Sequence, residues 1–281
     1  MTNPVSPSDP RKLGSPGDVT HFDADTALEP AGEGRWRAWT PDHWFVGRGP
    51  NGGFLAAVAA RAAETAAARP LRSLSLHFVA VPAVGPLDVA VTLEREGRSY
   101  SAASVRFEQD GGPMTLGLVT LGELPEEGAE WDATAMPDAR PLAEAQRVSF
   151  EEAGIPAFMR NYDMRWALGS DGSAHGSGGW IRTTEPRTLD APLVAAMTDA
   201  WAPAAFVALG RVVAAPTLDL TVHFRRPLPV PGMAPEEYVL GRFRSRLSVA
   251  GVWEEDGELW TPRGELIAQS RQLALVRERP A

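Results

Sequence analysis

The side chains available for chemistry in this sequence are carboxylates, amides, hydroxyls and a few imidazoles, because cysteine is absent. Without cysteine the chain has no disulfide, no thiolate metal ligand and no thiol nucleophile. The G-x-S-x-G nucleophile elbow of serine hydrolases is also missing. The five histidines have no close metal-ligand spacing and stand at positions 21, 43, 77, 175 and 223. We therefore expect no bound metal and no serine or cysteine nucleophile.

Two adjacent glycines, Gly52 and Gly53, open a segment with helical periodicity. The first N–H groups of a helix have no partner inside the helix, and the helix dipole favours negative charge there. Because glycine has no Cβ, these N–H groups could receive an oxyanion or a pyrophosphate. A simple turn after Pro50-Asn51 explains the glycines equally well.

The charge balance argues against two classes of partner. The 281 residues include 27 basic and 36 acidic side chains, for a net charge of -9, so a bulk attraction to nucleic acid or to an anionic membrane is not expected. No segment approaches the roughly 20 apolar residues of a membrane-spanning helix. Residues 1–19 lack the apolar run of a signal peptide and are interpreted as a disordered leader. We expect a cytoplasmic protein without a nucleic-acid partner.

The chain contains an internal repeat, and this repeat must position any site. Phe22–Leu28 is echoed in the second half by Tyr162–Leu168. Apolar residues at helical spacing predict one helix over 53–67 and another over 191–209. In both halves a short strand precedes the helix and an alternating meander follows it. Each half therefore has the same order of elements.

Each meander is typical of four antiparallel strands separated by glycine-rich turns. The expected strands cover 72–81, 86–97, 99–109 and 113–122, then 217–227, 236–247, 251–261 and 265–276. This pattern predicts an α+β protein with two tandem units, 20–123 and 160–278, joined by a linker over 124–159. Two unrelated units that share short patterns by chance are the alternative.

The motifs in their order resemble the acyl-CoA thioesterase II (TesB-like) family. The resemblance rests on NGGFLAAVAARAAET, RSLSLHFVAVPAVG and VTLEREGRSYSAASVRFEQDGGPMTLGLVTL in the first half, and on PLVAAMTDAWAP, PTLDLTVHFRRP and GELIAQSRQLALVR in the second. It implies a double hotdog fold, in which each unit packs a long helix on an antiparallel sheet and the two sheets join. It also implies hydrolysis of fatty acyl-CoA thioesters without a metal, a cofactor or a covalent intermediate.

The resemblance also implies three catalytic residues. In the family an Asp on the second helix, a Thr at the start of the next strand and a Gln on the last strand activate the attacking water. Motif by motif these match Asp199, Thr217 and Gln272. Asp199 lies in an apolar helix, so we expect burial to raise its pKa into the range of a useful base. Gln269 lies on the opposite strand face from Gln272, so only one of them can point into the site.

Three aromatic residues near these motifs, Trp44, Phe54 and Trp201, are candidates to line a tunnel for the acyl chain. Aromatic residues beside a helix are more often part of the core. One departure from the family concerns a histidine of the first unit, because its position holds Ser75 here, with His77 two residues further along the same strand face.

The sequence leaves more than one function open. The leading hypothesis is a hydrolase acting on acyl-CoA. The alternative is a catalytically silent double hotdog protein that binds acyl-CoA or a lipid-like ligand, since folds outlive activities. An enoyl-CoA hydratase ranks last, because the Asp/His pair expected before its helix is missing. Exposed sheet edges predict a homo-oligomer.

Overall fold

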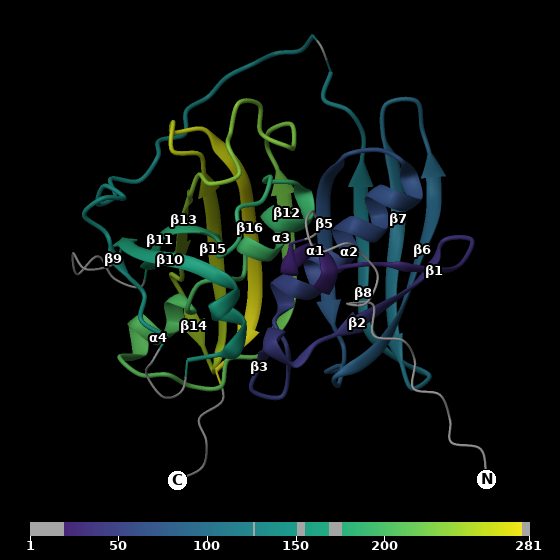
Figure 1. Cartoon of the computed structure of the whole chain (residues 1–281), viewed down its shortest axis with the longest axis horizontal. Coiled ribbons are helices and arrows are strands. Elements are labelled where there is room, and N and C mark those ends of the chain that lie inside the picture. The colour runs from purple at the N-terminus through teal and green to yellow at the C-terminus, as the bar shows by residue number, and fades with distance from the viewer. Residues whose placement is uncertain (1–19, 126, 151–154, 169–175, 277–281) are drawn as a thin grey trace.

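The computed structural model of the chain describes residues 20–125, 127–150, 155–168 and 176–276. The expected leader at 1–19 lies outside this range. Within it, an antiparallel sheet of 14 strands runs through the whole molecule, with helices on one face (Figure 1). The strands of the first half are β1 (Glu29–Gly32), β2 (Arg35–Thr40), β5 (Leu71–Phe78), β6 (Gly85–Glu96), β7 (Ser101–Gln109) and β8 (Gly112–Leu121).

The second half repeats this arrangement in mirror order across the sheet. Its strands are β9 (Gln146–Arg147), β10 (Tyr162–Leu168), β11 (Gly176–Thr183), β12 (Thr217–Phe224), β13 (Val239–Arg244), β14 (Ser248–Val249), β15 (Val252–Trp260) and β16 (Leu266–Leu275). The order across the sheet is β1-β2-β6-β7-β8-β5-β12-β16-β15-β13-β11-β10-β9, and β14 pairs with β15. A separate small sheet joins β3 (Phe45–Val46) to β4 (Gly49–Pro50). The two large half-sheets therefore join into one, as the sequence predicts.

The two halves meet where β5 pairs with β12, its counterpart in the repeat. Leu74 and Leu76 of β5 lie opposite Val222 and Leu220 of β12, and all four are buried under the helices. Side chains of a strand alternate between its faces, so the residues between them point to the other face of the sheet. There the hydroxyl of Ser75 lies 2.8 Å from that of Thr221.

The helices are α1 (His21–Asp25), α2 (Gly52–Ala67), α3 (Ala191–Met197) and α4 (Ala204–Leu209), with short 3-10 turns at Asp42–Trp44 and Ala157–Asn161. The continuous helix expected over 191–209 is wrong, because the chain leaves the helix after Met197 and re-enters it at Ala204. Pro203 explains the break. In a continuous helix its ring would clash with the carbonyl of Asp199, and it has no N–H to donate to that carbonyl.

Helix α2 is rich in alanine because it packs closely against its neighbours. Most of its residues between Gly53 and Ala63 are buried, and it packs against α3. A Cβ built on Gly53 would lie 2.4 Å from the carbonyl oxygen of Ala196. Glycine at this position therefore allows the start of α2 to touch the end of α3.

The echoed segments Phe22–Leu28 and Tyr162–Leu168 adopt different structures, so their similarity in sequence does not mark equivalent elements of the two halves. In the first half the echo lies in and after α1, where the Thr20 hydroxyl accepts a hydrogen bond from the Asp23 N–H at 3.2 Å and caps the helix. In the second half Tyr162–Leu168 is strand β10, paired with β11. By position in the sheet, the counterpart of β10 is β1.

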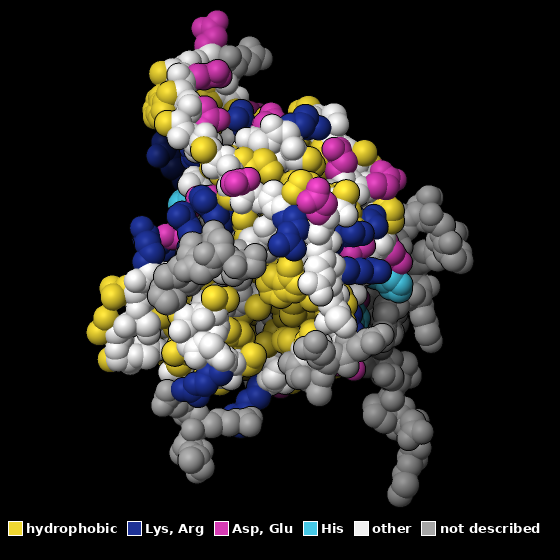
Figure 2. All heavy atoms as spheres, turned by 90° about the vertical axis from the view of Figure 1, so that its left-hand side faces the viewer, with side chains coloured by type: hydrophobic (Ala, Val, Ile, Leu, Met, Phe, Trp, Pro, Cys, Tyr) yellow, Lys and Arg dark blue, Asp and Glu magenta, His cyan; other side chains and the backbone are white. Residues whose placement is uncertain are grey.

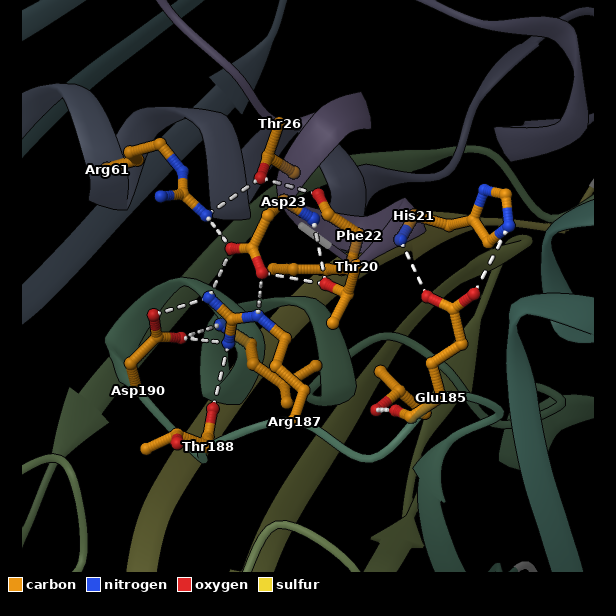
Figure 3. A network of polar contacts seen from close by, with 12 residues as sticks. Thr20, His21, Phe22, Asp23, Thr26, Arg61, Glu185, Arg187, Thr188 and Asp190 are labelled. Atoms are coloured by element: carbon orange, nitrogen blue, oxygen red, sulfur yellow. Dashed lines mark hydrogen bonds and ion pairs between the residues drawn. The ribbon is translucent and has the colours of Figure 1, made fainter. Parts of the chain in front are cut away.

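A network of ion pairs ties α1 and α2 to the start of α3 (Figure 3). Arg187 lies at its centre, with one nitrogen 2.7 Å from Asp23 and 2.6 Å from Asp190, the N-cap residue of α3. Arg61 of α2 donates to Asp23 at 2.9 Å. Burial raises the pKa of Asp23, but hydrogen bonds from Arg187, Thr20 and Arg61 outweigh burial and lower it to about 2. The network therefore fixes the start of α3, and Asp199 lies in the turn that follows the end of this helix.

Candidate active site

Asp199 lies in the turn that follows α3, at the break between α3 and α4. Because the helix ends here, the backbone carbonyl of Asp199 is free to bind outside the helix. It accepts a hydrogen bond from the side-chain amide of Asn51 at 2.9 Å. Asn51 is the N-cap residue of α2, and its own Oδ1 accepts the N–H of Phe54 at 3.1 Å. The end of α3 and the start of α2 are thus joined by one amide side chain.

The two oxygens of the Asp199 carboxylate have different surroundings. Oδ2 accepts from Asn51 Nδ2 at 2.9 Å and from the Gly53 N–H at 3.0 Å. Oδ1 lies 3.4 Å from Gln272 Nε2, which is a long hydrogen bond, and the Gly52 N–H also contributes to stabilising the carboxylate. Burial raises the pKa of Asp199 to about 6, although the hydrogen bonds from Gly53, Gln272 and Asn51 act in the opposite direction. Oδ1 is therefore the oxygen better able to take a proton.

Gly52 and Gly53 do present N–H groups at a helix start, but these groups face Asp199. The Gly53 N–H donates to the carboxylate, and a Cβ on Gly52 would lie 3.0 Å from Asp199 Oδ2. The sequence left open an external anion or a simple turn at this helix start. In the structure the Gly53 N–H contacts a side chain from the other half of the chain, and substrate binding at Gly52 and Gly53 stays a prediction.

Thr217 reaches the inner face of the sheet because of a β-bulge. Strict alternation along β12 would place Thr217 on the same face as Asp219, away from the helices. The pairing with β16 shifts register between these two residues, so Leu218 is an extra, 36% exposed residue. The bulge turns Thr217 inward. Its hydroxyl donates to Gln272 Oε1 at 2.8 Å.

Gln272 connects the other two residues. It is 4% exposed on the inner face of β16, whereas Gln269 is exposed on the outer face. Its amide oxygen accepts from Thr217, and its amide nitrogen faces Asp199 Oδ1 at 3.4 Å. The structure thus brings together the three residues singled out by the family resemblance, from the turn after α3, the start of β12 and the middle of β16.

Sequence reasoning missed Glu255 on β15. This residue is 3% exposed and accepts from Gln272 Nε2 at 2.7 Å and from the Ala204 N–H at 2.6 Å. Burial raises its pKa to about 8, and the charge of Asp199 adds to this rise. Alternation with Trp253 and Leu259 places Glu255 on the buried face of β15, so a charged residue at an inward position was an available signal.

Two further residues of the site were also missed. Asn51 precedes the glycine pair, and Asn is a favoured N-cap, so its position was readable. Tyr162 is fully buried, and its hydroxyl has no hydrogen-bond partner among the residues that the structure describes. Burial and the charge of Asp199 raise its pKa. Its ring lies edge-on to Trp44, with centroids 5.9 Å apart.

The three candidate tunnel aromatics are buried in one hydrophobic core. Trp44 and Phe54 stack with centroids 5.1 Å apart, and the Trp44 indole donates to Asp25 at 2.9 Å. Trp201 packs edge-on against Trp166 of β10 at 5.0 Å. The acyl tunnel stays a prediction.

A groove of about 400 Å³ runs beside α4, lined by residues that include Ala205, Leu209, Leu247 and Val276. Ala205 directly follows Ala204, whose N–H donates to Glu255, so the groove begins next to the polar network. Figure 2 shows the face of the molecule that carries β10 and α4. Apolar side chains gather there in a hollow, with basic side chains on its border.

Ser75 and His77, the departure from the family pattern, lie on the opposite face of the sheet from α2. The Ser75 hydroxyl is engaged with Thr221 of β12, and His77 is exposed. Neither residue is part of the polar network around Asp199. The described part of the chain contains no cluster of three or more His, Cys, Asp or Glu side chains that could hold a metal. It also contains no helix long and apolar enough to span a membrane.

Two family models cover most of the chain. Residues 40–122 match the acyl-CoA thioesterase N-terminal domain, and residues 125–276 match the acyl-CoA thioesterase C-terminal domain. The chain belongs to the acyl-CoA thioesterase family. A relative, an uncharacterized protein of Mycobacterium tuberculosis, is 28% identical over an alignment of 270 residues, and the alignment covers 84% of this chain and 88% of the relative.

Solved structures have the same fold as this chain. A conserved protein of unknown function with hot dog fold from Alicyclobacillus acidocaldarius has a TM-score of 0.82 and 28% identity, over 93% of this chain and all of that one (100%). Acyl-CoA thioesterase II TesB2 from Mycobacterium marinum has a TM-score of 0.72 and 20% identity, over 92% and 98%. The double hotdog α+β fold and the TesB-like resemblance are confirmed.

Proposed function

We propose that this thioesterase hydrolyses fatty acyl-CoA to a free acid and CoA by means of a water held among Asp199, Thr217 and Gln272. The observation that carries the proposal is the buried chain of contacts from Thr217 through Gln272 to Asp199, at distances of 2.8 and 3.4 Å. A thioester carbonyl is already electrophilic, so its hydrolysis needs a positioned water and a base more than a covalent nucleophile.

The contacts assign a role to each residue. The Thr217 hydroxyl donates its hydrogen bond to Gln272 Oε1, so the lone pairs of the hydroxyl oxygen can accept a hydrogen bond from water. Asp199 Oδ1, the less engaged oxygen, takes the proton as the water oxygen attacks the carbonyl carbon. The carbon–sulfur bond then breaks, and the proton passes from Asp199 to the CoA sulfur. With a pKa of about 6, Asp199 is ionised at neutral pH and able to accept this proton.

The groove near the polar network supports an acyl chain as the apolar part of the substrate. The groove beside α4 is lined by apolar residues such as Leu209 and Leu247, and it begins next to Ala204 at the edge of the network. Ser245, Arg246 and Ser248 add polar side chains to its wall, and clefts of this size that combine an apolar lining with a few polar groups are typical of ligand sites. The length of this groove would then limit the length of the acyl group that the protein accepts.

The proposal is tested by free-thiol release from acyl-CoAs of increasing length, from acetyl to palmitoyl. We expect the wild type to turn over part of this panel. Asp199→Asn should still bind acyl-CoA and lose about 10²–10⁴-fold in turnover, because the base is gone. Gln269→Ala should keep wild-type turnover and serves as a control, since Gln269 lies on β16 beside Gln272 but faces outward. An Asp199→Asn protein with full turnover would overturn the mechanism, and wild-type binding without turnover would identify a silent binder.

A further inference from the structure

Glu255 is a second buried carboxylate in the network, and the mechanism above does not use it. It lies on the inner face of β15 and is 3% exposed, between Trp253 and Leu259 on a face that is otherwise apolar. An isolated carboxylate at such a position would be strongly unfavourable. Both of its oxygens are hydrogen-bonded, one to the Ala204 N–H at 2.6 Å and the other to Gln272 Nε2 at 2.7 Å.

The first consequence concerns the orientation of the Gln272 side chain. An amide can be turned by half a rotation, which exchanges its oxygen and its nitrogen. Above its pKa of about 8 Glu255 is ionised and only accepts hydrogen bonds, so it then requires the NH₂ group of Gln272 on its side. The amide oxygen of Gln272 then faces Thr217, as the 2.8 Å contact shows. Glu255 therefore decides which atom Gln272 presents to Thr217.

The second consequence concerns the basicity of Asp199. The NH₂ group of Gln272 lies between two carboxylates, 2.7 Å from Glu255 and 3.4 Å from Asp199. Glu255 thus takes the shorter bond and leaves Asp199 Oδ1 weakly engaged. A hydrogen bond to a carboxylate favours its ionised form and makes it a weaker base. Weakening that bond keeps Asp199 a stronger base.

We propose that Glu255 is a positioning residue of the active site, which holds the Gln272 amide toward Thr217 and keeps Asp199 Oδ1 free for the proton of the attacking water. This inference rests on the proposed function. The groups facing Glu255 are Asp199, the Gln272 amide and the Ala204 N–H, and Glu254 acts on it from the same strand.

The test compares the same Glu→Gln substitution at two neighbouring positions of β15. Glu255→Gln offers one acceptor and one NH₂ group to two N–H donors, so Gln272 must turn or the Ala204 N–H must lose its partner. Glu254→Gln is the control, because Glu254 accepts from Ser245 and from the Arg246 N–H instead. We expect Glu255→Gln to lower kcat by about tenfold to a hundredfold, with KM little changed, as expected for a misplaced catalytic contact. Glu254→Gln should keep wild-type kinetics.

The pH profile separates positioning from a purely structural role. In the wild type, kcat should rise as Asp199 ionises near pH 6 and rise again near pH 8, where the Glu255 charge strengthens the base. Glu255→Gln should lose the second rise. Glu255→Asp, which keeps the carboxylate, should retain it and serves as the readout if the amide variant does not fold. An unchanged profile in Glu255→Gln, or loss of the second rise in Glu254→Gln, would overturn the inference.

A readout without substrate keeps this inference distinct from the proposed function. In protein labelled with ¹⁵N-glutamine, the side-chain NH₂ signal of Gln272, assigned from its absence in Gln272→Ala, should titrate near pH 8. It should stop doing so in Glu255→Gln. If the wild type hydrolyses no acyl-CoA, the proposed function fails while this titration still decides the role of Glu255. A Gln272 signal that does not titrate in the wild type would refute that role.

Discussion

Asn51 makes three hydrogen bonds where the halves of the chain meet, so replacing it tests how the site is held. Its Oδ1 caps α2 through the Phe54 N–H, and its Nδ2 lies 2.9 Å from both the carbonyl oxygen and Oδ2 of Asp199. Asn51→Ala removes all three bonds. Asn51→Ser keeps a good N-cap hydroxyl and loses only the bonds to Asp199. Comparing the two variants separates the cap from the contact with the carboxylate.

The magnitudes follow from these contacts. Loss of an N-cap side chain costs about 1 kcal/mol, and loss of a hydrogen bond to a charged group costs about 1.5–3 kcal/mol. We expect Asn51→Ser to lower the free energy of unfolding by about 1.5–3 kcal/mol and Asn51→Ala by about 1 kcal/mol more. Urea unfolding at neutral pH measures both values.

The same substitutions should change the pH dependence of hydrolysis. The Asn51 amide stabilises the ionised form of Asp199, so without it the pKa of Asp199 moves upward from about 6. The acid limb of kcat/KM should therefore move to higher pH in both variants, with activity recovering as pH rises. Equal stability of the wild type and Asn51→Ser, or an acid limb that does not move, would refute the argument.

Two further substitutions test the elements around the site. Asp23→Asn should flatten the acid side of the stability profile. The folded pKa of Asp23, about 2, is below its unfolded value. Ionised Asp23 therefore contributes at most about 2 kcal/mol of stability above roughly pH 4, and this contribution is lost as pH falls toward 2. Urea unfolding across that pH range measures the contribution, and parallel stability profiles for the variant and the wild type would contradict this prediction. Deleting Leu218 removes the extra residue of the bulge, so regular pairing should keep Thr217 opposite Ala274 on the inner face, and turnover should stay close to that of the wild type while circular dichroism keeps the sheet signal. A large loss of turnover in a folded deletion variant would contradict this account of how the bulge places Thr217.

The alternation of side chains along strands could be read from the sequence, and it separated Gln272 from Gln269 correctly. Alternation fails at Thr217, because the extra residue of a bulge depends on the pairing with β16 and leaves no mark in β12 itself. The break after Met197 was readable from Pro203, yet the apolar periodicity continues across it and hides it. A single proline thus predicts a break in the helix, whereas the apolar periodicity over 191–209 predicts a continuous one.

Contacts between distant segments were beyond local patterns. Glu255 meets Gln272 only because β15 pairs with β16 in one register, and a shift of a single residue would turn it outward. Asn51 meets Asp199 because α2 and α3 cross closely at Gly53. The family resemblance supplied the three catalytic candidates, whereas the residues that hold them come from the three-dimensional arrangement.

The helix pair α2–α3 has two ends, and the repeat makes these ends approximate equivalents. At one end the N-cap residue of α2, Asn51, binds the carboxylate of Asp199. At the other end the N-cap residue of α3, Asp190, binds Arg187 in the ionic network with Asp23. Two identical units would carry the same residues at both ends. Because the two units are fused into one chain, the residues at the two ends can differ in sequence. One end can then hold the Asp199 carboxylate, while ion pairs at the other end hold the helices together.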